Sequence, residues 1–590
     1  MLEFIQLLKQ RYQAMQSDAE LSNSDYSERL AQLILAEAFL RKGELVRRSL
    51  ELAQQKTVLQ VTVLGPTQAG KSSVVNVLLN NELAGVSPLA GYTVHAQGFC
   101  QDISLADCQP LQRYFGRFQQ VTREQLSKQR FDCYSLTENP KQSPYLKQAV
   151  LWDTPDFDSI DAATYKEGVL RAIALADIII VVLSKEKYAD ASVWEMLTLL
   201  EALHQPTIIC LNKLSEDSEP LLLASLKEKW QQARTDHFPP VVPLYYQKNN
   251  QLPVWQSQYD TVLPQAIQQI NYSQQARFEQ AFLQYYWQDW LEPVYAEHQA
   301  IIDLQQLIEQ IIKHALEDYQ RDYLNHPHYY ETFQQALAEL LLLLEVPKLA
   351  SLLTGTRQAL TWPLRQVLKL GRKRGHRPDN SQELLLLNQL AEHVLIQLAH
   401  ELLHKAQQNP LGGWWKELSS LLRTQRQGVL HEFNLAAKNY HLNFQHEIEQ
   451  TAQQLYSKLQ QQPLVLNSLR ATRISTDAAL IAMTLYTGGI GLHDLVLAPA
   501  MLTVTSFLTE SAVGSYMHKL EVDLKFKQLE TVKTDLFVTV LTQKLLALTE
   551  QLSNTGHFNI TVTQTNQAQQ QLNDYLLLEK RHGLRLMGLN

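Results

Sequence analysis

Residues 58–72 read VLQVTVLGPTQAGKS, and they are the most informative segment for the fold of the first half of the chain. The residues 58–64 are aliphatic or β-branched apart from one glutamine, which predicts a buried strand. Residues 65–72 fit the pattern GxxxxGK[ST], and residues 73–79 continue with helical spacing. A strand, a glycine-framed loop and a helix in direct succession predict a phosphate-binding loop.

The chemistry of this loop suits a triphosphate. Its two glycines let the backbone curl so that successive N–H groups face one anion, and the helix that follows adds its dipole. Lys71 would neutralise the β- and γ-phosphates, and the Ser72 hydroxyl would join the shell of a Mg²⁺ ion. The predicted nucleotide-binding residues of the loop are Gly65, Thr67, Gln68, Ala69, Gly70, Lys71, Ser72 and Ser73.

An acidic residue follows the next predicted strand, Ala149–Trp152. Asp153 stands at its carboxyl end, where a Walker-type carboxylate would hold Mg²⁺ beside the phosphate loop. A solvated loop aspartate is the alternative.

Thr93 is the second candidate for the metal and for catalysis. It lies in the segment 87–95, between the first helix and the next strand, from which a threonine could reach Mg²⁺ when a γ-phosphate is present. An ordinary strand threonine is the alternative. The predicted metal ligands are therefore Ser72, Thr93 and Asp153.

Further short apolar runs continue the pattern at Ile178–Leu183, Thr207–Leu211 and Val241–Tyr245, and helical stretches separate several of them. Alternating strands and helices indicate a mostly parallel sheet with helices on both faces. We therefore expect an α/β domain over residues 57–270.

Helical segments flank this domain. Residues 1–56 show apolar side chains at three- and four-residue steps, which predicts an N-terminal helical segment. Residues 271–590 consist mostly of long amphipathic stretches, which predict an all-α bundle or stalk. Phe558–Thr563 is the single candidate strand in that part of the sequence.

The composition narrows the setting. The chain has 52 Lys and Arg against 60 Asp and Glu, a net charge of −8, which argues against nucleic acid as a partner. Its 4 cysteines lack CxxC spacing, and its first residues lack the apolar core of a signal peptide. These features predict a cytoplasmic protein.

The motifs resemble those of translation-factor-like P-loop GTPases, in particular the Era-like and dynamin-like branches. The resemblance covers residues 57–250 and is carried by Ala69-Gly70-Lys71-Ser72-Ser73, by Asp153-Thr154-Pro155, which resembles the third motif, and by Leu211-Asn212-Lys213-Leu214, which resembles the base-recognition motif. It implies GTP as the substrate and Mg²⁺ as the cofactor.

By the same resemblance, Asn212 would contact guanine and Lys213 would pack along its ring. The helices before and after the α/β domain look like those of bacterial dynamin-like proteins. In the GTPase family the catalytic water is often positioned by a polar residue of the phosphate loop or by a partner subunit. We therefore expect a homodimer formed through the GTPase domain and slow hydrolysis that self-association stimulates. The catalytic candidates are Lys71, Gln68 and Thr93.

Two residues depart from the family pattern. The third motif usually ends in glycine, whose N–H senses the γ-phosphate, whereas this chain has Asp156. The base-recognition motif usually ends in an aspartate that accepts two hydrogen bonds from guanine, whereas this chain has Ser215. A serine is a weaker, uncharged acceptor, so guanine preference is a hypothesis.

Two later segments are candidates for membrane contact. Residues 346–378 carry lysines and arginines interleaved with apolar side chains and contain no acid, which suits an anionic membrane surface. A solvated loop or a nucleic-acid contact is the alternative. Residues 478–509 are predicted to form an apolar hairpin, and each of its two arms is too short to span a bilayer. It would dip into one leaflet or pack in a protein core.

These expectations combine into one function. We expect a GTPase that couples its nucleotide state to membrane binding or self-assembly through its helical region, in the cytoplasm or peripherally at the inner face of a membrane. The alternative is a nucleotide-gated interaction protein with little hydrolysis. A GTPase acting on RNA is less favoured, because no RNA-binding motif is recognisable.

Overall fold

The protein is described from a computed structural model and divides into two compact units. The first unit is Met1–His298 with Asn554–Asn590, and the second unit is Gln299–Ser553. The structure describes all residues except 17–23, 52–57, 87–92, 128, 158–161, 216–217, 246–252, 327–329, 345–380, 409–411, 472–507, 512, 553–556 and 578–590.

The first unit contains an eight-stranded sheet in the order β3-β4-β2-β5-β1-β6-β7-β8. The pair β2–β5 is antiparallel and the other neighbouring pairs are parallel, which confirms the predicted mostly parallel sheet. The strands are β1 (Leu59–Leu64), β2 (Ala96–Gln101), β3 (Gln119–Val121), β4 (Cys133–Glu138), β5 (Ala149–Asp153), β6 (Ile178–Ser184), β7 (Thr207–Leu214) and β8 (Val241–Tyr245).

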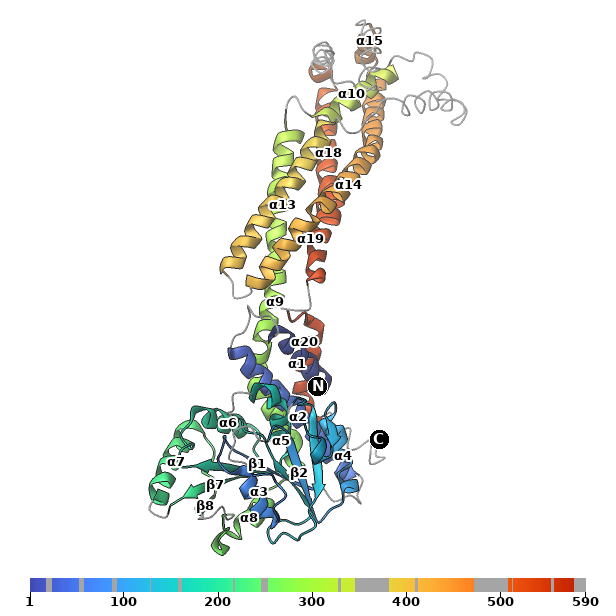
Figure 1. The fold of residues 1–590 in the computed structure, drawn as a ribbon. Coiled ribbons are helices and arrows are strands. Elements are labelled where there is room, and N and C mark those ends of the chain that lie inside the picture. Colours follow the sequence, from blue (N-terminus) through green and yellow to red (C-terminus); the bar gives the residue numbers. More distant parts are fainter. Residues whose placement is uncertain are drawn as a thin grey trace. The chain divides into compact units, whose positions relative to one another are not determined.

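Helices cover both faces of this sheet (Figure 1). Because side chains alternate along a strand, Val61 and Val63 of β1 face α3 and α8, whereas Leu64 belongs to the core under α2 and α5. The helices of this unit are α1 (Leu2–Gln16), α2 (Ser24–Glu51), α3 (Lys71–Leu79), α4 (Pro110–Phe115), α5 (Ala162–Leu175), α6 (Ala191–Glu201), α7 (Glu219–Ala233), α8 (Val262–Gln268), the first part of α9 (Gln275–Tyr319) and α20 (Val562–Asn573).

The sequences of strands β2, β3 and β4 contain no long apolar run, so the positions of their apolar residues do not predict where these strands begin and end. They are held by polar contacts as well as by the sheet. Gln101, fully buried in β2, donates to the carbonyl of Lys141 at 3.2 Å and accepts from Asn139 at 2.7 Å. Such hydrogen bonds stabilise a buried polar side chain in a strand whose sequence, judged by its polar residues, would suggest a loop.

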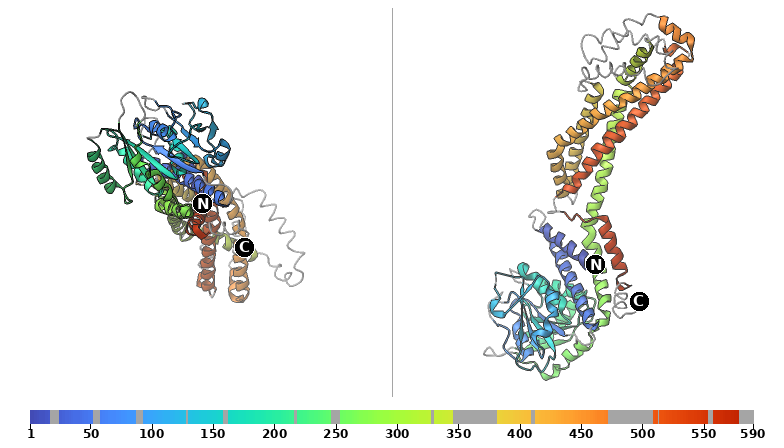
Figure 2. Two further views of the ribbon diagram at one scale, coloured as in Figure 1. Left: turned by 90° about the horizontal axis from the view of Figure 1, so that it is seen from below. Right: turned by 90° about the vertical axis from the view of Figure 1, so that its right-hand side faces the viewer.

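The first unit also includes helices that the predicted division assigned elsewhere. That division separated 1–56 and placed 271–590 together, whereas α1, α2, the start of α9 and α20 pack with the sheet domain. The last of these helices lies beside α9 (Figures 1 and 2), where Trp287 donates to Gln569 at 2.6 Å. Burial of their apolar faces explains this arrangement.

The candidate strand Phe558–Thr563 is wrong. Residues 558–561 are irregular, and α20 begins at Val562. Thr561 and Gln564 form a capping box, in which the Thr561 hydroxyl accepts from the Gln564 N–H at 3.3 Å and the Gln564 side chain accepts from the Thr561 N–H at 2.9 Å. The β-branched Thr561 therefore caps a helix and does not continue a strand.

Helix α9 is continuous through Pro293. Proline removes one helical hydrogen bond and crowds the preceding turn. Buried Trp290, Leu291 and Val294 pack this turn into the core, and the Tyr12 hydroxyl donates to the Trp290 carbonyl at 2.9 Å. Tertiary packing therefore outweighs the helix-breaking tendency of Pro293.

The described residues of the second unit form helices joined by short irregular segments and include no strand, which confirms the predicted all-α region. Helices α13, α14 and α18 run side by side (Figures 1 and 2). Its described helices are the rest of α9, a π-helical turn Gln320–Leu324, α10 (Glu331–Leu344), α13 (Gln382–Gln408), α14 (Gly412–Gln460), α15 (Pro463–Ala471), α18 (Gly514–Thr531), a π-helix Val532–Thr542, α19 (Gln543–Ala547) and a 3₁₀ helix Leu548–Gln551.

A buried carboxylate joins four of these helices. Glu383 accepts hydrogen bonds from Tyr319 at 2.6 Å, Tyr440 at 2.8 Å and Gln528 at 2.7 Å, and His441 lies 3.1 Å away. Burial opposes ionisation of Glu383, but the hydrogen bonds from His441 and the tyrosines hold its pKa below the usual range.

The segments expected to meet a membrane are not part of this description. Residues 346–378 lie outside the described residues, as do residues 478–507 of the apolar hairpin. Among the helices that the structure does describe, none combines the length and the apolar character needed to cross a bilayer.

Candidate functional site

The site begins at the loop between β1 and α3, whose two glycines are structurally required. A Cβ atom on Gly65 would lie 2.3 Å from the carbonyl oxygen of Val182 in β6, so only glycine fits there. Gly70 has a φ of +93°, and a Cβ atom on it would lie 2.2 Å from Nδ2 of Asn212. The loop therefore follows the tight path expected of a phosphate cradle.

Lys71, the first residue of α3, is buried with its ammonium group at this loop. Its Nζ donates to the carbonyl of Pro66 at 3.2 Å and forms an ion pair with Asp156. The side chains of Lys71 and Asp156 are 6% and 14% exposed, so the pair is largely shielded from water.

Ser72 and Asp153 lie together, as the sequence predicted for two ligands of one metal ion. The Ser72 hydroxyl donates to Oδ2 of Asp153 at 2.8 Å. Burial raises the pKa of Asp153 to about 6, while the Ser72 hydroxyl and the Lys71 ammonium favour its ionised form.

Oδ1 of Asp153 is buried and lacks a hydrogen-bond partner among the described residues. A buried carboxylate oxygen without a partner costs free energy, and a cation would offset that cost. The residues present therefore fit Mg²⁺, which Ser72 and Asp153 would hold together with phosphate oxygens.

The base-recognition motif packs directly against the phosphate loop. Asn212 is buried, and its Nδ2 donates to the carbonyl of Ala69 at 2.9 Å. The Lys213 ammonium donates to the carbonyl of Gln68 at 2.8 Å. These bonds tie the end of β7 to the loop that follows β1, so the predicted base and phosphate sites lie beside each other.

Other predicted residues are placed less centrally. Thr93 is half-buried before β2 and makes no hydrogen bond to Ser72 or Asp153 among the described residues. Gln68 is exposed on the loop with a φ of +60°. Ser215 is exposed, and its hydroxyl lies 2.9 Å from that of Ser218. Their roles in catalysis and base recognition remain predictions.

One supporting residue was not recognised from the sequence. Thr154 is fully buried, and its hydroxyl donates to the carbonyl of Val63 in β1 at 2.8 Å. This bond fixes the start of the loop that carries Asp156. The Asp-Thr-Pro motif was visible in the sequence, but the partner of Thr154 comes from a different strand and has no sequence signal.

A comparison with protein families supports a nucleotide-binding role for this site. A family model described as 50S ribosome-binding GTPase matches residues 60–213. No curated protein matches the chain in sequence.

Solved structures similar to the chain include two of an oligomerised bacterial dynamin pair, described as a mechanism for long-range sensing and tethering of membranes. The first is 11% identical with a TM-score of 0.36 and covers 96% of this chain and 94% of that chain. The second is 11% identical with a TM-score of 0.35 and covers 97% and 95%.

The family match spans the phosphate loop, Asp153 and the base-recognition motif, and the sheet has the expected mostly parallel order. Residues 60–213 therefore form a P-loop GTPase domain that binds GTP.

Proposed function

We propose that this chain hydrolyses GTP with Mg²⁺ and uses its nucleotide state to control membrane binding or self-assembly through its helical region. One observation carries the proposal: Lys71, Ser72 and Asp153 meet at the phosphate loop, with a buried oxygen of Asp153 left for a cation. When bound, Mg²⁺ would neutralise charge on the β- and γ-phosphates. Lys71 would hold the same oxygens, and Asn212 and Lys213 would hold the base.

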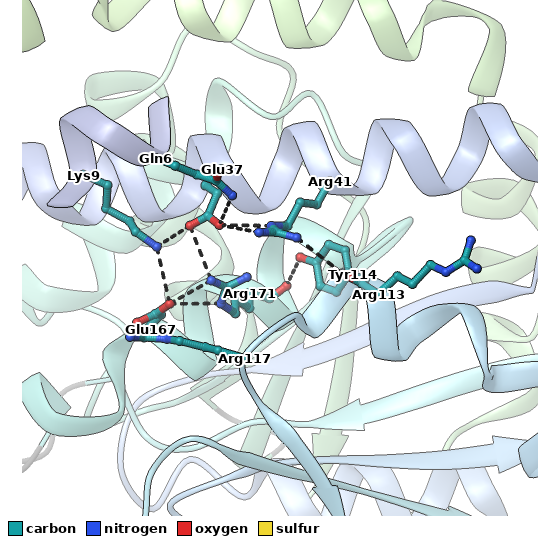
Figure 3. A network of polar contacts seen from close by, with 9 residues as sticks. All are labelled: Gln6, Lys9, Glu37, Arg41, Arg113, Tyr114, Arg117, Glu167 and Arg171. Carbon is teal, nitrogen blue, oxygen red and sulfur yellow. Dashed lines mark hydrogen bonds and ion pairs between the residues drawn. The ribbon is translucent and has the colours of Figure 1, made fainter. Parts of the chain in front are cut away.

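A cluster of charged side chains supports coupling between the site and the N-terminal helices (Figure 3). Helix α5 follows the loop that carries Asp156, and its Arg171 lies 3.4 Å from Glu37 of α2 and 2.8 Å from Glu167. Lys9 of α1 forms ion pairs with the same two acids.

The cluster extends to α4 as well. The Tyr114 hydroxyl donates to the carbonyl of Arg171 at 2.6 Å, and Arg41 of α2 donates to the carbonyl of Arg113 at 3.5 Å. A shift of α5 on nucleotide binding would therefore disturb contacts of α1, α2 and α4 together.

The membrane part of the proposal has a separate basis. It rests on the basic residues of 346–378 and the apolar residues of 478–509, and an anionic surface would attract the former. Self-assembly through the GTPase domain is proposed as the step that raises a slow intrinsic rate.

A second candidate function is nucleotide-gated binding of a partner with little turnover. The ion pair between Lys71 and Asp156 favours it, because the ammonium that would hold the phosphates already has an anionic partner. Ser215 adds to this argument, since it is a weaker acceptor for guanine than aspartate.

Phosphate release by the full chain separates the two candidates. GTP turnover is measured with Mg²⁺ at several protein concentrations, with and without vesicles containing anionic lipid, and Lys71→Ala is the control. Turnover that rises with concentration or with vesicles, and is lost in Lys71→Ala, supports the first candidate. Binding of GTP without turnover under all these conditions supports the second.

A further inference from the structure

Asp156 stands where the related GTPases have glycine, and its carboxylate contacts the one ammonium group of the phosphate loop. Residues 65–72 contain a single cationic side chain, that of Lys71. The ion pair is largely buried, and a charge-assisted bond of this kind is stronger than a neutral one.

The position of Asp156 is set by the fold. It follows β5 at the end of Asp153-Thr154-Pro155, and the buried Thr154 hydroxyl bonds to Val63 in β1 at 2.8 Å. Pro155 restricts the backbone between this anchor and Asp156. The carboxylate is therefore held beside Lys71 by two neighbouring strands of the sheet.

A triphosphate needs the same ammonium group. Lys71 can bind the phosphates fully only if its ion pair with Asp156 is broken or shared. The carboxylate of Asp156 then lies beside the negative charge of the phosphates. We propose that Asp156 is an internal competitor of the nucleotide for Lys71, which lowers nucleotide affinity and speeds nucleotide release. This inference rests on GTP binding at the loop and does not depend on hydrolysis.

Competition and simple repulsion predict different results. If Asp156 competes for Lys71, its removal matters only while Lys71 is present. If it acts only by repelling phosphate, its removal strengthens binding with or without the lysine. A double-mutant cycle between the two positions separates these mechanisms.

The test measures binding of a non-hydrolysable GTP analogue to the full chain with Mg²⁺, by calorimetry and by displacement of a fluorescent nucleotide. Asp156→Asn, which keeps the shape of the side chain, should bind about tenfold more tightly than the parent, with a slower dissociation rate. Asp156→Gly provides a second variant, and circular dichroism confirms that each is folded. Asp132→Asn removes an exposed carboxylate from the same domain and should leave affinity unchanged.

The cycle is completed with Lys71→Met alone and combined with Asp156→Asn. Both proteins are titrated to nucleotide concentrations at which weak binding is measurable. Equal affinity of the two supports competition, whereas tighter binding by the double variant overturns it. Equal affinity of the parent and both Asp156 variants also overturns the inference. Absence of analogue binding by every protein would instead refute GTP binding at this loop, and with it the inference.

Discussion

Replacing Glu37 with glutamine tests whether the cluster in Figure 3 holds α1 and α2 against the GTPase domain. Glu37 forms ion pairs with Lys9, Arg41 and Arg171, and its side chain is 3% exposed. Glutamine keeps the size of the side chain but removes its charge. Two of these cations, Lys9 and Arg171, then retain Glu167 as a shared acidic partner.

The expected cost follows from the ionisation of Glu37. Burial would raise its pKa, but Arg171, Lys9 and Arg41 outweigh burial and lower the pKa from 4.5 to about 2. A pKa lowered that far corresponds to about 3 kcal/mol of stabilisation at neutral pH, because each tenfold change in proton affinity is about 1.4 kcal/mol. Breaking a buried ion pair costs a similar amount, about 3–5 kcal/mol.

The pH dependence has a definite sign. Because the folded state has the lower pKa, the stabilisation by Glu37 is complete above pH 4.5 and is lost as the pH falls toward about 2. The difference between the parent and Glu37→Gln should therefore narrow from about 3 kcal/mol at pH 7 to about 1.4 kcal/mol at pH 3.

Hydrogen exchange with peptide-level mass spectrometry measures this effect on the full chain. At pH 7, peptides of α1 and α2 should exchange about 100-fold faster in Glu37→Gln than in the parent. Glu44→Gln, an exposed position on the same helix, is the matched control and should exchange like the parent. Exchange within about threefold of the parent in Glu37→Gln, or a difference that does not shrink at pH 3, would refute the reasoning.

Three further changes test other parts of the molecule. Ser215→Asp should raise the ratio of GTP to ATP affinity by about tenfold, because a carboxylate accepts two hydrogen bonds from guanine. Calorimetry measures the ratio, and an unchanged ratio contradicts the proposed base site. Glu383→Ala should lower the free energy of unfolding of the second unit by about 3 kcal/mol, because four buried donors lose their acceptor. Urea unfolding followed by circular dichroism tests this, with the exposed Glu392→Ala as control; equal loss in both variants would argue against the buried cluster. Thr561→Ala removes the cap of α20 and should cost about 1 kcal/mol, seen as faster hydrogen exchange in that helix alone.

The phosphate loop and most of the sheet could be predicted from the sequence, because both produce local sequence patterns. The strands β1, β5, β6, β7 and β8 are apolar runs that are buried on both faces, and such runs are visible without tertiary information. The glycines and the lysine of the loop act through main-chain geometry and charge at fixed spacing. The sequence also places Ser72 just after the loop that follows β1 and Asp153 at the carboxyl end of β5, whereas their contact depends on β5 lying beside β1.

The hydrogen-bond partners of the buried polar side chains could not be predicted from the sequence, because they depend on how the chain packs. Gln101 belongs to a strand because its side chain bonds to Asn139 and to the carbonyl of Lys141, which lie in a later part of the chain. Pro293 stays within a helix because the buried residues around it outweigh the lost hydrogen bond.

The same holds for the charges around the site. The sequence places Asp156 in the third motif, but its ion pair with Lys71 depends on β5 lying beside β1. The ion pairs of Glu37 likewise join helices distant in the sequence. Local patterns specify backbone conformation through nearest neighbours, whereas the pairing of buried charges depends on distances that only the packed chain defines.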